Sequence, residues 1–456
     1  MPSSLAFVLV AGFVVWLFRR DLRERPNVTA ALWIPFVWFL INCSRTVAQW
    51  LELFGGGFGG GSVEEGTPLD AVCNLMLIAA GFFVLKRRSV QLGKVVRWNG
   101  WLALFFGFCL LAVLWSDYPF VSFKRWIKIL GHPIMALVVL TEPDSEEALT
   151  RLLKRCAYVF VPFSILFIKY FPQWGRGFDG WSGLPSNTGM TTNKNILGCV
   201  CFILGFFFAW QLQKNWPRKK EPDGRRETIL CLFFFAAIVW LLYMAHSSTS
   251  LVSLAAGLGA MWVFGFRFLN SRNVVGFTIT AVVVLVLANW TLGIKDHLVA
   301  ALGKDPTLTD RTKIWNEVLK FDINRVVGTG FESFWLGERS DYMATIFFWR
   351  PNQAHNGYLE TYLNLGLVGL GLMLACIYAA FCKGARMMAD NLTLARFRLG
   401  FVVAFVLYNW TEAAFKALHP MWFIFFLVLM EYPAPPVMSA DDTLPTDDVE
   451  TSAALG

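Results

Sequence analysis

The chain has 456 residues, of which 56% are hydrophobic and only 16% are charged, and its mean hydropathy is +0.51. Soluble domains carry about a quarter charged residues, so this composition excludes a soluble globular protein and indicates that lipid surrounds much of the chain. The net charge of +8 does not indicate a nucleic-acid partner, because the basic residues fall in short clusters between apolar runs, as topology signals do.

Thirteen apolar runs are expected to form membrane helices. Several are shorter than the roughly 20 residues that a crossing needs, so we expect them to extend into their flanks. The first run is followed by an arginine cluster and has no small-residue cleavage site, which predicts a retained helix. The fold class expected is all-α, a polytopic membrane helix bundle of 12–13 transmembrane helices with one large extracytoplasmic loop. The runs are 4–18, 30–43, 70–85, 100–115, 126–141, 156–170, 196–210, 228–244, 251–266, 273–291, 366–381, 398–411 and 420–431.

Alternate connections differ sharply in Lys and Arg content. One set holds 24 and the opposite set of short connections holds 8, while the remaining 8 lie in the long loop 292–365. The positive-inside rule places the first set in the cytoplasm, and the N-terminus and the long loop outside. We therefore expect a bundle over residues 1–432 and a disordered, acidic cytoplasmic tail over 433–456.

Three outward connections stand out before the motifs are considered: 171–195, the short turn 245–250 and the long loop 292–365. Connection 171–195 is rich in Gly, Asn, Thr and Trp and carries Arg176 and Lys194. Loop 292–365 is long enough to be functional or disordered, and its many aromatic residues favour a folded segment. Within it, Asp310 can cap a helix that begins at Arg311 and places Trp315 on the same face as Arg311.

The segment 350–369 carries the strongest signal. Pro351 blocks helix continuation before it, so His355 and Asn356 should start a helix that runs into the eleventh apolar run. Unpaired N–H groups at such a helix start suit a phosphate or pyrophosphate. Asn356, Glu360 and Asn364 recur every four residues and make a polar face that enters the membrane, which is costly unless it serves function.

These residues resemble a known family. The run HNGYLETYLNLGLVGL (355–370) is similar to the signature of the O-antigen ligase and O-antigen polymerase superfamily. Further matching pieces occur in order: WSDYP (115–119), TNKNILG (192–198), DRTKIW (310–315), VGTGF (327–331) and NWTE (409–412). The pieces KNILG and SSTSL look closest to the exopolysaccharide polymerase branch.

The resemblance implies a reaction and its participants. The substrate class is an undecaprenyl-pyrophosphate-linked oligosaccharide at the periplasmic face of the bacterial inner membrane, with membrane lipid around it. An acceptor hydroxyl attacks the anomeric carbon and the lipid pyrophosphate leaves, without a metal, another cofactor or a nucleotide sugar. A chain-length regulator and a flippase are possible partners by the same analogy, and no nucleic acid is implied.

The resemblance also assigns residues. The catalytic histidine corresponds to His355 and the loop arginine to Arg311. Many members carry an Arg in the turn that here reads Ser247-Ser248-Thr249-Ser250, so another cation is expected to take its place. The expected pyrophosphate-binding residues are Lys194, Arg176, Arg350 and Asn356, and the expected substrate-binding residues are Trp315, Asn195, Glu360, Ser247, Ser250 and Glu412.

The chemistry fits these residue types. A sugar hydroxyl is a weak nucleophile, and imidazole is suited to remove its proton near neutral pH. Arg and Lys can hold the charge of the leaving pyrophosphate. For two of these residues a role outside the site remains open: Arg350 could anchor the loop at the headgroups, and Glu412 could be an ordinary helix-end charge.

Three other functions remain to be weighed. A ligase would transfer the glycan to lipid A core instead of to a lipid-linked repeat unit. A transporter of small anions or lipid-linked sugars would show repeats and charges inside its spans, and few acidic residues lie within these runs. A polyprenyl-phosphate glycosyltransferase of the other large membrane class is weak, because the chain has no D-x-D motif.

Overall fold

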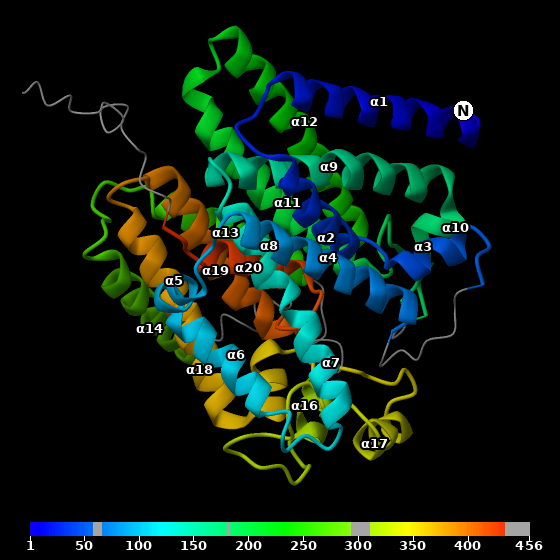
Figure 1. The fold of residues 1–456 in the computed structure, drawn as a ribbon, viewed down its shortest axis with the longest axis vertical. Coiled ribbons are helices and arrows are strands. Elements are labelled where there is room, and N and C mark those ends of the chain that lie inside the picture. The colour runs from blue at the N-terminus through cyan, green and yellow to red at the C-terminus, as the bar shows by residue number, and fades with distance from the viewer. Residues whose placement is uncertain (58–65, 180–182, 293–310, 434–456) are drawn as a thin grey trace, which may run out of the picture.

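The computed structural model describes residues 1–57, 66–179, 183–292 and 311–433, and these ranges are mostly helical (Figure 1). The expected helix cap at Asp310, the first part of the long loop and the tail from 434 onward lie outside the described residues. Within them, one two-stranded antiparallel sheet pairs β1 (Arg176–Phe178) with β2 (Pro185–Asn187).

The apolar runs of the first half become helices separated by short connections. The elements up to the small sheet are α1 (Ser3–Arg23), η1 (Ala30–Leu32), α2 (Trp33–Cys43), α3 (Val47–Leu53), α4 (Pro68–Arg87), α5 (Leu92–Trp98), α6 (Gly100–Leu111), α7 (Pro119–Ile129), α8 (Gly131–Leu140), α9 (Ser145–Tyr170) and α10 (Pro172–Gly175).

The second half contains the long central helices and the outer loop. Its elements are α11 (Lys194–Asn215), η2 (Trp216–Arg218), α12 (Pro222–Ala245), α13 (Ser248–Val263), α14 (Val274–Leu292), α16 (Arg311–Val318), α17 (Glu338–Ile346), α18 (Gly357–Met387), α19 (Leu392–Thr411) and α20 (Pro420–Leu429).

The helices form a polytopic membrane bundle, as expected. By length and composition, five described helices can cross a membrane, or up to seven if each of two pairs bent by 62° and 104° counts as one crossing. The expectation of 12–13 crossings counts every apolar run as one. Several runs instead form short apolar helices, such as the 10-residue α20, or pair with a neighbour across a sharp bend.

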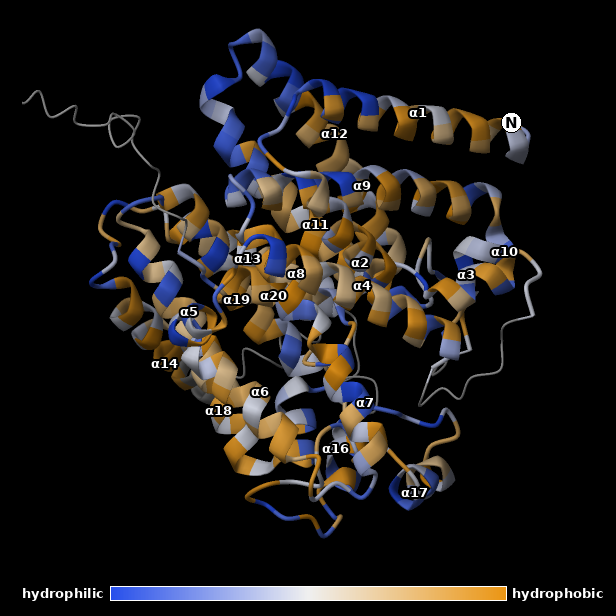
Figure 2. Cartoon of the chain, in the orientation of Figure 1, coloured by the Kyte–Doolittle hydropathy of each residue, from blue (hydrophilic) through white to orange (hydrophobic). Residues whose placement is uncertain are grey.

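Helix α11 lies at the centre of the bundle because its sequence is apolar on every side. Phe202, Phe206, Phe207 and Phe208 of this helix are fully buried, and α9, α12, α13, α19 and α20 pack around it. By contrast, α4 exposes Phe82 and other large apolar side chains, which in a soluble protein would be unfavourable and here face lipid. Figure 2 shows hydrophobic residues throughout the bundle and hydrophilic ones concentrated at its edges and around α16 and α17.

The helix after His355 does not continue straight into the membrane. Gly366 has φ 62° and ψ −162°, which breaks α18 in its first third. The turn 325–330 fills the break: Gly330 N–H donates to the Asn364 carbonyl at 2.9 Å, and Leu367 N–H donates to the Arg325 carbonyl at 2.9 Å. Backbone groups freed by the break are thus paired inside the protein, as the apolar surroundings require.

The described part of the outer loop is folded, in agreement with its aromatic composition. Ile314 and Val318 of α16 pack with Phe334, Trp335 and other residues into a second apolar core. The remaining members of this core are Met343, Phe347, Ala354 and Leu363. Since Leu363 belongs to α18, the loop core is seated directly on the helix that begins after His355.

Candidate active site

Three of the expected site residues meet at one point. The Arg311 guanidinium donates from Nη2 to Glu412 Oε1 at 2.8 Å, and His355 Nδ1 lies 3.3 Å from Glu412 Oε2. These residues come from the start of α16, the loop before α18 and the end of α19. Glu412, which the sequence alone left as either a site residue or an ordinary helix-end charge, therefore links Arg311 and His355, the two residues expected to carry catalysis.

The environment of Glu412 keeps it ionised. Its side chain is only 9% exposed, and burial alone would raise the pKa of this carboxyl. Arg311 and the hydrogen bond from His355 outweigh burial and lower the pKa to about 2. Glu412 is therefore a fixed negative charge at any physiological pH.

The chain after α19 is shaped to bring Glu412 back towards His355. Asn409 Oδ1 accepts the Ala414 N–H at 3.0 Å, and the Glu412 carbonyl accepts the Gly357 N–H at 3.1 Å. A Cβ on Gly357 would lie 2.4 Å from Asn409 Oδ1, so only glycine allows this approach. The His-Asn-Gly and Asn-Trp-Thr-Glu pieces of the sequence thus lie side by side, although 57 residues separate His355 from Glu412.

His355 itself stands in an unusual backbone conformation. Its φ is 50°, in the left-handed region, and its side chain is 18% exposed. The Trp349 ring lies 6.2 Å from the imidazole, and Gln353 Nε2 lies 3.4 Å from Nδ1. With Nδ1–H donated to Glu412, the remaining ring nitrogen, Nε2, is a base in the neutral tautomer.

The expected unpaired N–H groups at the start of α18 are not present. Asn356 Oδ1 accepts the Tyr358 and Leu359 N–H groups at 3.0 Å each, and the Gly357 N–H is taken by Glu412. The expectation of unpaired N–H groups is therefore wrong, because the Asn356 side chain caps the helix, while Asn356 as a pyrophosphate ligand stays a prediction.

The polar face of α18 holds the outer loop in place. Glu360 Oε2 accepts the Ala354 N–H at 2.8 Å and the Trp335 Nε1–H at 3.1 Å. Asn364 Oδ1 accepts the Phe334 N–H at 3.1 Å. Trp315 makes a further hydrogen bond to this segment, in which its Nε1–H donates to the Ala354 carbonyl at 2.8 Å. Ala354, the residue before His355, is therefore held through both its N–H and its carbonyl.

A large cavity is lined by residues close in sequence to the His355 constellation, by which we mean His355, Arg311 and Glu412, although none of these three lines it. It has a volume of about 770 Å³ and is lined by Arg350, Pro351 and Asn352, by Glu360, Thr361 and Asn364 of α18, and by residues of α6, α7, α17 and the 415–418 segment. Four of its lining side chains are cationic: Arg125, Lys128, Arg350 and Lys416. This volume is in the range of sites that enclose a ligand of several rings.

Sequence reasoning missed three of those cations. Arg125 and Lys128 lie on α7, and Lys416 lies between α19 and α20. A signal was available, because Lys124 and Arg125 end the outward connection before the fifth apolar run and Lys128 lies at the start of that run. Such a cluster is contrary to the charge rule that places basic residues inside.

Other expected site residues lie apart from His355. Lys194 at the start of α11 forms an ion pair with Asp179, and Arg176 Nε donates to the Ile168 carbonyl at 3.0 Å. Within the described ranges, neither makes a hydrogen bond or ion pair with the His355 constellation. Asn195 is half-buried in the first turn of α11.

The serines of the 247–250 turn serve helix packing. Ser247 Oγ donates to Ser250 Oγ at 2.9 Å, and both are buried. A Cβ on Gly198 of α11 would lie 2.4 Å from Ser247 Cβ, so this turn touches α11 closely. Thr249 reaches Thr411 at 2.9 Å, one residue before Glu412, so the 247–250 turn borders the site.

Comparison with known proteins agrees with the sequence motifs. A model of the O-antigen ligase family matches residues 232–374, a segment that includes Arg311 and His355. The chain is 26% identical over 294 residues to the exopolysaccharide production protein ExoQ of Rhizobium meliloti (strain 1021), covering 62% of this chain and 64% of that protein. The match thus spans less than two thirds of that relative's length, and it confirms the resemblance drawn from the motifs.

Proposed function

We propose that this multi-pass membrane protein, which a model of the O-antigen ligase family matches over residues 232–374, is a polysaccharide polymerase of the bacterial inner membrane. In this proposal it transfers an undecaprenyl-pyrophosphate-linked glycan onto a hydroxyl of a second lipid-linked repeat unit on the periplasmic side. The observation that carries the proposal is a histidine held by a buried carboxylate that also pairs with Arg311, in a loop whose residues 350–352 line a cavity with four cationic side chains.

In the proposed reaction, His355 is the general base. Glu412 accepts a hydrogen bond from Nδ1–H, which keeps the proton on Nδ1 and leaves Nε2 unprotonated. Nε2 takes the proton of the acceptor hydroxyl while the new oxygen–carbon bond forms at the anomeric carbon. The bond from that carbon to the pyrophosphate oxygen breaks, and undecaprenyl pyrophosphate leaves with the electron pair.

Glu412 also stabilises the product of this step. The imidazolium that forms on His355 lies 3.3 Å from a carboxylate that stays ionised. A hydrogen bond between two charged partners contributes on the order of 1.5–3 kcal/mol, more than a neutral one. Glu412 is therefore a positioning residue that favours the charged state that the base reaches during transfer.

The cations of the cavity are candidates for holding the pyrophosphate. Arg125, Lys128, Arg350 and Lys416 line one volume, and charge-assisted bonds from such groups to phosphate oxygens are strong. They could replace the Arg that many family members carry at the 247–250 turn. Arg311 is committed to Glu412 in this state, and it would reach the pyrophosphate by exchanging that partner or with its other N–H groups.

The polymerase is favoured over the ligase by one observation. The curated relative is described as an exopolysaccharide production protein, and a polymer of that kind grows from lipid-linked units instead of being placed on lipid A core. The two activities differ only in the acceptor hydroxyl, so the same base and cations serve either.

The test is an acceptor assay with the purified full-length chain in lipid nanodiscs. Undecaprenyl-pyrophosphate-linked repeat units are supplied alone or together with lipid A core, and products are separated by size. The proposal expects a ladder of lengthened glycans from the repeat units alone. A single transfer to lipid A core without a ladder would establish a ligase, and solute movement across sealed vesicles without any glycan product would establish a transporter.

A further inference from the structure

A second, larger cavity lies far from the His355 constellation in the fold. It has a volume of about 1120 Å³ and lies between the C-terminal part of α1, the charged first half of α9 and the start of α12. Figure 1 shows these helix ends at the opposite side of the molecule from α16 and α17. The glycan-transfer proposal uses no residue of this α1–α12 cavity.

The charged residues in and behind the wall of the cavity form a balanced network. Asp21 accepts from Arg151 at 2.9 Å and from Arg155 at 2.8 Å. Glu227 accepts from Arg20 at 2.9 Å and also pairs with Lys154. Glu24 and Glu147 complete the network by pairing with Arg151, so four acids and four bases neutralise one another and tie α1, α9 and α12 together.

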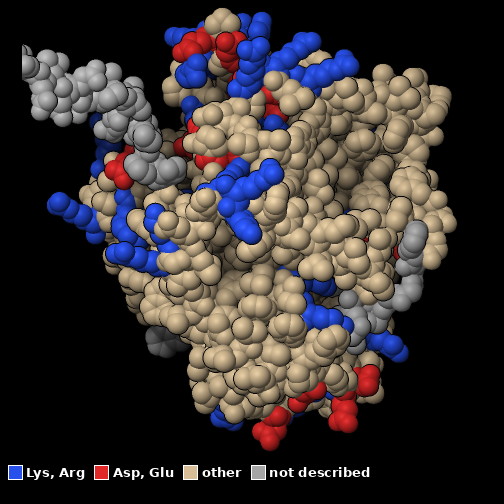
Figure 3. Space-filling view, in the orientation of Figure 1, with Lys and Arg blue, Asp and Glu red and all other residues tan. Residues whose placement is uncertain are grey.

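The rim of the cavity carries charge that this network does not neutralise. Arg19 and Arg23 line the cavity and are exposed, and within the described ranges neither has an ion pair. Arg218 and Arg226 line the other side, and their acidic partners Glu221 and Asp223 are themselves exposed to solvent. Figure 3 shows many Lys and Arg residues at this end of the molecule, with acidic residues among them, and a further group of acidic residues at the opposite edge.

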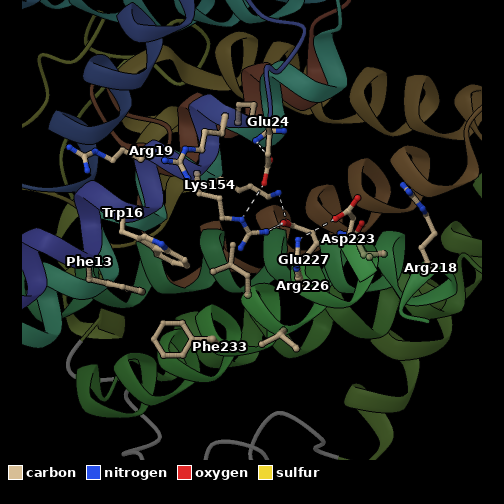
Figure 4. A pocket seen from close by; sticks show the side chains of 17 residues that line it. Phe13, Trp16, Arg19, Glu24, Lys154, Arg218, Asp223, Arg226, Glu227 and Phe233 are labelled. Atoms are coloured by element: carbon tan, nitrogen blue, oxygen red, sulfur yellow. Dashed lines mark hydrogen bonds and ion pairs between the residues drawn. The ribbon is translucent and has the colours of Figure 1, made fainter. Parts of the chain in front are cut away.

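One wall of the cavity is apolar and aromatic. Phe13 of α1 and Phe233 of α12 meet at 6.0 Å between ring centroids, and Trp16 and Ile229 line the cavity with exposed fractions of 53% and 57%. Figure 4 shows the rings of Phe13, Trp16 and Phe233 towards one end of the cavity and Asp223, Arg226 and Glu227 towards the other. One hollow thus offers cations at its rim and an exposed hydrocarbon surface beside them.

From this arrangement we propose that the α1–α12 cavity binds an anionic phospholipid. The phosphate of the headgroup lies at Arg19 and Arg23, and the acyl chains lie along Trp16, Ile229 and Phe233. Basic pockets between membrane helices are suited to anionic headgroups, and exposed aromatic side chains suit the boundary between headgroups and hydrocarbon. A soluble polyanion would satisfy the arginines but would leave the aromatic wall uncovered, so the lipid fits both halves of the cavity.

The test compares lipids on the purified full-length chain by native mass spectrometry. Dioleoyl phosphatidylglycerol should bind more tightly than dioleoyl phosphatidylcholine. Each basic side chain near an anionic lipid contributes roughly fivefold in affinity, so R19A/R23A should bind phosphatidylglycerol about 25-fold more weakly. The matched control R267A/R272A removes two exposed arginines that do not line the cavity and should leave the affinity unchanged.

Two further arms separate the lipid from a free anion and from misfolding. Inorganic phosphate and dihexanoyl phosphatidylglycerol should compete poorly, and W16A should weaken the long-chain lipid more than the short-chain one. The variant R19K/R23K keeps the charge and should retain most of the binding. Equal affinity for the two dioleoyl lipids, equal losses in both double-alanine variants, or full displacement by inorganic phosphate would each overturn the proposal.

Discussion

Replacing Glu412 by Gln changes one atom group and tests how the His355 constellation is held. The amide keeps the shape of the side chain, but it removes the negative charge that faces both Arg311 at 2.8 Å and His355 at 3.3 Å. A charge-assisted hydrogen bond contributes on the order of 1.5–3 kcal/mol and a neutral one about 1 kcal/mol. Loss of this difference of about 0.5–2 kcal/mol at the imidazolium should lower kcat roughly 2- to 30-fold, since 1.36 kcal/mol is a factor of ten in rate.

The same substitution should change stability with a definite pH dependence. The pKa of Glu412 is about 2 in the folded protein, against a usual value of 4.5. A lowered carboxylate pKa stabilises the fold above the usual value, and this stabilisation disappears as pH falls from about 4.5 towards 2. The difference corresponds to roughly 3 kcal/mol, so E412Q should lose stability at neutral pH and show a flatter acid limb.

The assay pairs polymerisation kinetics with thermal unfolding from pH 3 to 8. The control is E338Q, which removes an exposed acid in the first turn of α17 and should change neither quantity. We expect kcat to fall while KM for the lipid-linked donor stays within a few-fold, because Arg311 and the cavity cations remain. An unchanged kcat, or a loss confined to KM, would refute the positioning role of Glu412.

Three further substitutions test the surroundings of the site. G366A should abolish accumulation of folded protein, because this residue has φ 62° and a Cβ would lie 2.3 Å from the Val326 backbone carbonyl carbon. The control G371A lies in the same helix, where a Cβ meets nothing within 4 Å, and should be tolerated. Detergent extraction followed by size-exclusion chromatography compares the two variants. N356A should cost about 1–2 kcal/mol of stability through loss of the helix cap, while N356S should recover most of it in thermal unfolding. Burial lowers the pKa of His419 to about 4, so the folded protein should lose stability as pH falls from 6.5 towards 4. The variant H419N keeps a capping side chain and should remove that part of the pH dependence. A pH profile of stability identical to that of the unmodified protein would contradict this cause.

Much of the architecture could be predicted because apolar runs report helices directly. Each of the thirteen runs contains helix in the structure. The number of crossings could not be predicted in the same way, because a run does not show whether its helix is straight, bent or short. The break at Gly366 is an example: the sequence predicts one helix that starts near His355 and runs into the apolar run 366–381, and only the tertiary contact with the 325–330 turn makes the glycine necessary.

The site was predictable in its parts and less so in its connections. The positions of His355 and Arg311 follow from short motifs, but the role of Glu412 depends on a turn that Asn409 forms after α19. The expectation of unpaired N–H groups at the start of α18 was wrong because the sequence alone does not show that the Asn356 side chain accepts them. The cations Arg125 and Lys128 were missed since their cavity is built from segments about 200 residues apart.

The most direct measurement is polymerisation by the variant H355N in nanodiscs containing undecaprenyl-pyrophosphate-linked repeat units. Asn tolerates the left-handed backbone that His355 adopts at φ 50°, and His246 at φ 49° offers a matched control, H246N. The account predicts that H355N loses chain elongation by a factor of at least about 100 while still binding the donor, since general base catalysis contributes 10²–10⁴, and that H246N elongates normally. Elongation by H355N at the rate of the unmodified protein would contradict the assignment of His355 as the base.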